Sequence, residues 1–93
     1  MMNTTHELIR QNLLSQLEAA YPIALPIPTL KQGLLLAGLN LLNHQLEKEL
    51  EYLHDKGFLT QTFSELCPHN KRYKLSTKGI DFLEDENRHN TGF

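Results

Sequence analysis

The stretch that decides the fold covers residues 43–76 and reads NHQLEKELEYLHDKGFLTQTFSELCPHNKRYKLS. Its first part predicts a helix over residues 44–56 that ends at Gly57, because glycine readily adopts the left-handed conformation of a helix stop. Four leucines recur at steps of four, four and three, which is the spacing of one helical face. They are Leu42, Leu46, Leu50 and Leu53. We expect this face to be buried.

The second part of the stretch predicts a β-hairpin. Residues 58–64 have the β-branched and aromatic composition of a strand, and a turn is expected at residues 65–70. Residues 72–76 alternate polar and apolar side chains, so Tyr73 and Leu75 should face the core. A helix that runs directly into a two-stranded hairpin is therefore the expected centre of the domain.

The sequence before this centre predicts two helices joined by a proline-rich connector. The first helix covers residues 4–21. The connector, residues 22–28, contains three prolines, which exclude a helix interior and leave room for a short edge strand at residues 23–25. Thr29 is expected to cap a short second helix that ends at Gly38.

The sequence after the hairpin predicts a last helix capped by Ser76. The residues that follow Glu86 show no periodicity. We therefore expect one domain over residues 1–93, with an ordered core at about residues 4–86 and a short flexible tail at residues 87–93.

Composition excludes some classes of protein and leaves others open. The formal net charge of -2 gives no overall basic signature, but the basic residues are segregated along the chain. The single cysteine, Cys67, allows no intramolecular disulfide and favours an intracellular setting. Since no apolar run approaches membrane-spanning length, a soluble cytoplasmic protein is expected.

The order of elements and two local motifs resemble the winged helix-turn-helix superfamily of small prokaryotic or phage regulators. The first motif, similar to a recognition helix that enters a wing strand, is Leu46-x3-Leu50-x2-Leu53-x3-Gly57-Phe58-Leu59. The second, similar to the second wing strand and closing helix of the PadR- and MarR-like groups, is Tyr73-Lys74-Leu75-Ser76-Thr77-Lys78-Gly79-x3-Leu83. The resemblance implies an α+β fold, mostly α, with three helices, a two-stranded wing and a C-terminal helix. It also implies that the third helix enters the major groove of DNA while the wing lies on the backbone.

The third helix carries candidate DNA contacts near its start, for which Asn40 and Asn43 are alternative caps. The polar side chains that can reach base edges or phosphates are Asn43, His44, Gln45 and Lys48. Three glutamates on the same helix argue against this role, because their carboxylates repel phosphates. These are Glu47, Glu49 and Glu51. The alternative is an ordinary solvated helix face.

The second hairpin strand and the start of the last helix carry candidate phosphate contacts. The segment from residue 71 to residue 78 contains four basic residues and no acidic one. The basic residues are Lys71, Arg72, Lys74 and Lys78. Such contacts would make DNA affinity depend on salt. The alternative is that these charges only keep an edge strand soluble.

Other sites are not expected. Cys67 and His69 form only a pair, with His44 or His54 as distant additions, whereas zinc takes three or four protein ligands at recognised spacings. No phosphate loop, nucleophile elbow or metalloprotease motif is present, so we expect neither an enzyme nor a cofactor.

A surplus of leucines between residues 34 and 42 can serve either the core or a partner surface. In the related families the first and last helices form the usual dimer interface, so the resemblance implies a homodimer. The sequence thus favours a dimeric, DNA-binding transcription regulator of the compact type found on phages and mobile elements. The alternative is a winged-helix protein-interaction module that does not bind DNA.

Overall fold

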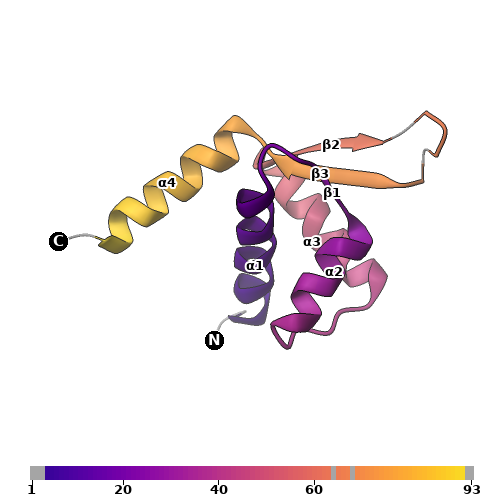
Figure 1. Ribbon diagram of the computed structural model, residues 1–93. Coiled ribbons are helices and arrows are strands. Elements are labelled where there is room, and N and C mark those ends of the chain that lie inside the picture. The colour runs from indigo at the N-terminus through magenta and orange to yellow at the C-terminus, as the bar shows by residue number, and fades with distance from the viewer. Residues whose placement is uncertain (1–3, 64, 68, 92–93) are drawn as a thin grey trace.

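The computed structural model describes residues 4–63, 65–67 and 69–91, and the side chains in these ranges other than those of 4 and 87–91. The elements are α1 (Thr4–Ala20), β1 (Leu25–Pro26), α2 (Ile27–Leu36), α3 (Asn43–Asp55), β2 (Leu59–Phe63), β3 (Lys71–Leu75) and α4 (Thr77–Thr91). Figure 1 shows α1, α2 and α3 packed as a body, from which α4 and the β2–β3 hairpin extend in opposite directions. The predicted class, α+β and mostly helical, is confirmed.

The core is built largely from leucines that the three helices of the body and the sheet direct inward. Seven of them are less than 2% exposed: Leu13, Leu17, Leu30, Leu34, Leu46, Leu50 and Leu75. On α3, Leu46, Leu50 and Leu53 are buried as predicted. Leu42 was also predicted to be buried, but it is 61% exposed. It is the N-cap residue and lies before the first helical turn, so the helical spacing does not apply to it, and Leu41 is buried instead.

Gly57 ends α3 and starts the hairpin, as predicted. Its φ of 86° lies in the left-handed region that side chains with a Cβ disfavour. The Gly57 N–H donates to the His54 carbonyl at 2.9 Å, and the Phe58 N–H donates to the Leu53 carbonyl at 3.0 Å. These bonds satisfy the last carbonyls of the helix, so the chain can reverse directly into β2. Gly38, with φ 82°, ends α2 in the same way.

The sheet has three antiparallel strands in the order β1-β3-β2. Leu59 pairs with Leu75 at one end of the hairpin and Phe63 with Lys71 at the other. Tyr73 and Leu75 are buried, as the alternating pattern predicted. The hairpin is therefore anchored to the body near Leu75 and projects toward its turn (Figure 1).

The proline-rich connector differs from the prediction in its boundaries. The short strand covers Leu25–Pro26 rather than residues 23–25, and Pro26 is tolerated there because β1 lies at the edge of the sheet. The second helix begins at Ile27, before Thr29, so the predicted Thr29 cap is wrong. Pro28 fits within the first helical turn, where a backbone N–H has no helical partner to lose.

Ser76 caps α4, as predicted, and also ties the helix to the hairpin. Its hydroxyl accepts a hydrogen bond from the Gly79 N–H at 3.0 Å and donates to the Gly57 carbonyl at 2.5 Å. The helical backbone continues to Thr91, past Glu86 where a tail was expected, because residues 87–91 include neither proline nor glycine. Residues 92–93 lie outside the described residues.

Among the described residues, the helices are too short or too polar for any of them to cross a membrane.

Replacement of Gly79 by alanine tests how closely α4 packs on the hairpin. A Cβ at this position would lie against the Phe58 carbonyl oxygen, which is held by a 3.0 Å hydrogen bond from the Ser76 N–H. We expect Gly79→Ala to lower the free energy of unfolding by about 1–3 kcal/mol, as overpacking does, measured by urea denaturation. Thr77→Ala, an exposed position in the same turn, serves as the control. An equal or higher stability of Gly79→Ala would contradict this close approach, since alanine otherwise favours helix by about 0.5–1 kcal/mol.

Candidate nucleic-acid interface

The burial of the α3 leucines determines which of its side chains face outward. His44, Lys48, Glu51 and Asp55 recur on the opposite side of the helix, and all four are exposed. This outward face lies opposite the leucine face that the sequence predicted to be buried. The first two of these residues lie in the N-terminal half of α3 and the two acidic residues in its C-terminal half, so the charge changes sign along the helix.

Two amide side chains at the start of α3 form hydrogen bonds within the protein. The Lys31 ammonium on α2 donates to Asn43 Oδ1 at 2.8 Å. The Leu42 backbone N–H donates to Gln45 Oε1 at 2.9 Å. Gln45 rather than Asn40 or Asn43 therefore supplies the side-chain bond at this helix start, and both asparagine caps are corrected. Helical geometry begins at Asn43 itself.

Glu49 is buried between α3 and α1, although the sequence suggested a repulsive surface charge. It is 5% exposed, its Oε1 accepts a hydrogen bond from Arg10 Nε at 2.7 Å, and its Oε2 contacts His6 Nδ1. The Arg10 guanidinium also lies over the Tyr52 ring, 3.8 Å from the ring centroid. The prediction that Glu49 repels DNA is therefore wrong, because its carboxylate is turned inward and paired.

Glu47 and Glu51 remain exposed, but they border the space between α3 and the hairpin. With His54 and Asp55 on the helix side, and Gln61, Lys71 and Tyr73 on the strand side, they line a cavity of about 460 Å³. The acidic side of α3 therefore faces the hairpin, whereas Lys48 and Gln45 line the groove toward α1.

The basic residues of the wing lie on two faces of the sheet. Arg72 and Lys74 alternate with the buried Tyr73 and Leu75, so they point to the outer face. Lys71 shares the face of Tyr73 and lines the acidic cavity beside α3. Lys71 thus lies on the other face of β3 from Arg72 and Lys74, although Lys71 and Arg72 both border a hollow beside Pro26 and Pro28.

Lys78 lies at the base of the hairpin, at the opposite end from Lys71. Its Nζ is 5.7 Å from the centroid of the Phe58 ring, and its aliphatic chain packs near Gly57. The predicted contacts therefore form four separate groups: the start of α3, Lys71 beside the acidic cavity, the outer face of the wing, and the hairpin base.

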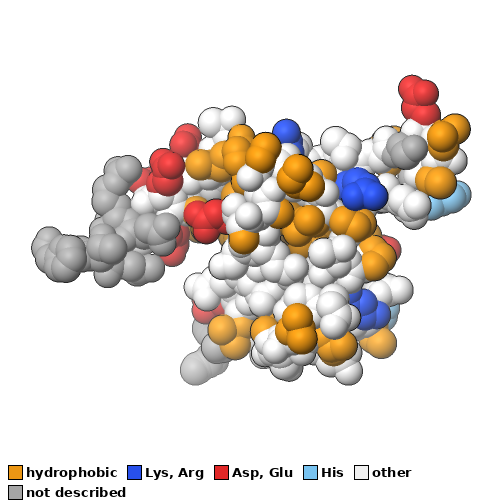
Figure 2. Space-filling view, in the orientation of Figure 1, with side chains coloured by type: hydrophobic (Ala, Val, Ile, Leu, Met, Phe, Trp, Pro, Cys, Tyr) orange, Lys and Arg blue, Asp and Glu red, His pale blue; other side chains and the backbone are white. Residues whose placement is uncertain are grey.

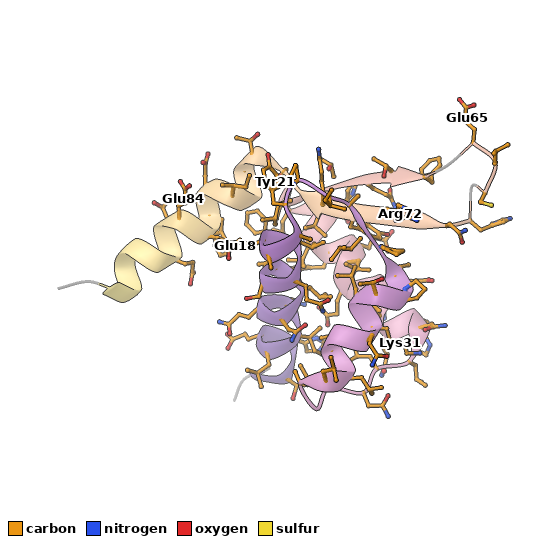
Figure 3. The ribbon with its side chains drawn as sticks, viewed as in Figure 1. Glu18, Tyr21, Lys31, Glu65, Arg72 and Glu84 are labelled. Atoms are coloured by element: carbon orange, nitrogen blue, oxygen red, sulfur yellow. The ribbon has the colours of Figure 1, made fainter. Side chains whose placement is uncertain are left out.

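Lys31 was not among the predicted contacts, because along the chain the second helix shows only a pattern of leucines. Figure 3 shows Lys31 on α2 and Arg72 on β3, on the same side of the molecule. In Figure 2 acidic side chains lie over α4 and α1 and at the tip of the hairpin, where Figure 3 labels Glu65, while the Lys and Arg side chains visible in this view lie over α2 and the sheet. The sequence feature that could have identified it is that Lys31 is the one basic residue of the helix before α3.

The leucine surplus divides between the core and the surface. Leu34 and Leu41 are buried, whereas Leu35, Leu36 and Leu42 are 47%, 80% and 61% exposed. A separate groove of about 560 Å³ lies where α1 and α3 meet α4, and its apolar lining includes Leu14, Tyr52, Phe58, Phe82 and Leu83. Phe58 and Phe82 stack with ring centroids 4.6 Å apart.

A metal site is not found among the described side chains, where no three His, Cys, Asp or Glu residues are grouped to hold an ion. Cys67 is exposed in the hairpin turn.

Comparison with known proteins supports the fold. No family model and no curated protein matches the chain. A solved structure, that of an hsRosR-S4 complex, is similar with a TM-score of 0.73 and 20% sequence identity, over 87% of this chain and 67% of that one. Its protein is a winged-helix protein, so the winged helix-turn-helix architecture is confirmed, while the narrower PadR- or MarR-like grouping stays a prediction.

Replacement of Glu49 by glutamine tests the buried connection between α1 and α3. The amide keeps the size of the carboxylate but loses its charge, so its bonds to Arg10 and His6 weaken. We expect Glu49→Gln to lower the free energy of unfolding by about 1–3 kcal/mol in thermal or urea denaturation. Glu47→Gln, which alters an exposed carboxylate of the same helix, should change it by less than about 0.5 kcal/mol. Equal effects of the two variants would argue against the inward role of Glu49.

Proposed function

We propose that this chain is a winged-helix DNA-binding protein that regulates transcription. The observation that carries the proposal is the polarity of α3. Its N-terminal half presents Asn43, His44, Gln45 and Lys48, with Lys31 adjacent to Asn43, while the nearby Glu49 is paired inside the protein. This half of the helix would enter the major groove, where side-chain amides and cations contact bases and phosphates.

The wing supports the same proposal through its outer face. Arg72 and Lys74 point away from the core, in position to contact phosphates beside the groove that α3 enters. Lys71 contributes less in this proposal, because it shares a cavity with Glu47 and Glu51. Lys78 would contact a phosphate only where the duplex reaches the base of the hairpin.

The similar structure is consistent with this role. hsRosR-S4 belongs to the RosR family of winged-helix transcription regulators. Because the two chains share 20% identity, the likeness extends to the fold, and the argument for DNA binding rests on the side chains of α3 and the wing.

The proposal includes a homodimer formed through α1 and α4. α4 extends away from the body (Figure 1) and leaves the apolar groove beside Phe82 and Leu83 open toward solvent. Two copies that cover this groove would present two α3 helices to one duplex. Recognition helices of such dimers contact half-sites about one DNA turn, roughly 34 Å, apart.

A protein-interaction role is the second candidate function. The observations that favour it are the acidic cavity beneath the wing and the exposed leucines Leu35, Leu36 and Leu42. In this role the chain would show no affinity for duplex DNA.

Removal of two wing charges tests DNA binding by its dependence on salt. We expect the chain to bind a mixed-sequence duplex at low salt, measured by fluorescence anisotropy. Arg72→Ala/Lys74→Ala should weaken binding and reduce the slope of log affinity against log salt by about 1.8, because each lost phosphate contact contributes about 0.9. Lys56→Ala, which removes a cation at the C-terminal end of α3, should leave the slope unchanged.

Two results would count against this assignment. Absence of binding at low salt would favour the protein-interaction role. Binding with an unaltered slope in the double variant would keep DNA binding and exclude the wing contacts.

Truncation of Phe82 tests the dimer. We expect the protein to form a dimer whose dissociation constant rises about tenfold or more in Phe82→Ala, measured by sedimentation equilibrium. Leu36→Ala, which removes an 80% exposed leucine from α2, is the matched control and should leave the constant unchanged. A wild-type chain that is monomeric at all concentrations, or dissociation by Leu36→Ala alone, would contradict an α1–α4 interface.

A further inference from the structure

The amide groups at the start of α3 are oriented by hydrogen bonds that their oxygen atoms accept from within the protein. Asn43 Oδ1 accepts from the Lys31 ammonium at 2.8 Å, and Gln45 Oε1 accepts from the Leu42 N–H at 2.9 Å. Both side chains are exposed. Their oxygens are held against the protein, so their NH2 groups are the atoms left to contact a partner.

The side chains around these amides add further donors. Lys31 and Lys48 carry ammonium groups, which donate hydrogen bonds and accept none. The carboxylates that could accept hydrogen bonds point elsewhere: Glu49 is paired with Arg10, and Glu47 lines the cavity beside the wing. His44 can present either a donor or an acceptor. The start of α3 is thus a surface of hydrogen-bond donors.

We infer that the start of α3 selects guanine in the major groove, an inference that rests on the proposed DNA-binding function. Guanine presents two adjacent acceptors there, N7 and O6, whereas adenine presents one acceptor beside an N6 donor. A surface of donors can satisfy both atoms of guanine. Against adenine, it would place an NH2 group opposite another donor.

The base preference expected of Asn43 and Gln45 in this structure differs from the one that their residue types suggest. From residue type alone, both amides suit adenine, which they bind by accepting from N6 and donating to N7. That arrangement needs the amide oxygen to face the base. In this structure each oxygen already accepts a bond within the protein, so adenine N6 would have to share that oxygen with Lys31 or with the Leu42 N–H.

Lys31 acts as a positioning residue for Asn43 in this scheme. Its ammonium keeps Oδ1 toward α2 and the NH2 group toward the groove. If Lys31 is replaced by methionine, Asn43 can rotate and accept from adenine N6. Lys31→Arg supplies a donor again and should restore the preference for guanine.

The test begins with selection of sites from a duplex library with a random central segment, using the full chain at low salt. Each guanine of a recovered site is then replaced by 7-deazaguanine, which lacks the N7 acceptor, and binding is measured by anisotropy. We expect guanines in the recovered sites and about three- to tenfold weaker binding at one or more substituted positions.

The variants assign those positions to side chains. Asn43→Ala or Gln45→Ala should abolish the effect of 7-deazaguanine at one position each. Lys31→Met should admit adenine at the Asn43 position, and Lys31→Arg should restore guanine. Asn40→Ala, which removes an exposed amide in the α2–α3 turn, is the matched control and should change neither base preference nor affinity.

The results separate this inference from the proposed function. Recovered sites that bind tightly with adenine at these positions, or that tolerate 7-deazaguanine throughout, would overturn the preference for guanine while DNA binding stands. Failure to recover any duplex would overturn the proposed function itself. If Lys31→Met weakens binding equally for all sequences and lowers the salt slope by about 0.9, Lys31 contacts a phosphate and its positioning role is overturned.

Discussion

The burial of one leucine face of α3 is the constraint on which the rest of the structure depends. Leu46, Leu50 and Leu53 pack into the core, so the rotation of α3 about its axis is set and the opposite face must be exposed. The Gly57 stop then places the hairpin directly beside the helix. Because Ser76 bonds to the Gly57 carbonyl, the start of α4 is tied to the same point. Helix, wing and closing helix therefore hold one relative arrangement, and the candidate interface follows from it.

Within this arrangement, the charge of α3 depends on the position of Glu49. Three glutamates at positions 47, 49 and 51 read as an acidic surface in the sequence, but the helical rotation turns the middle one toward α1. There Arg10 and His6 supply the hydrogen bonds that a buried carboxylate requires. The remaining pair lies toward the wing, and the first turns of α3 keep Lys48 and the two amides exposed. This difference is what makes DNA the better of the two candidate partners.

The hydrogen bonds of Asn43 and Gln45 determine which of their amide atoms can contact a partner, and residue type alone does not specify this. Asparagine and glutamine can each donate and accept, so their identity alone leaves the preferred base open. The bonds from Lys31 and from the Leu42 N–H orient the oxygens toward the protein and leave the NH2 groups exposed. A lysine on a neighbouring helix thereby enters the proposed specificity of a residue on α3. The same reasoning separates the wing residues, since alternation along β3 turns Lys71 toward the acidic side of α3 and Arg72 away from it.

The sequence by itself determined the order of the main elements, the two glycine stops, the Ser76 cap and the buried faces of α3 and β3. These features depend on local spacing and on backbone preferences that each residue carries with it. The predicted boundaries of the short strand and of the second helix, which lie near the prolines, differ from those in the structure. Pro28 suits a first helical turn as well as an extended connector, and only the pairing of β1 with β3 decides between the two. Only the tertiary structure decided that Glu49 is buried and that Lys31 forms a hydrogen bond with Asn43. It also decided that Lys71 faces the acidic side of α3 while Arg72 faces away from it. Each of these facts requires contact between residues distant in the chain, and periodicity along one element cannot specify what packs against it.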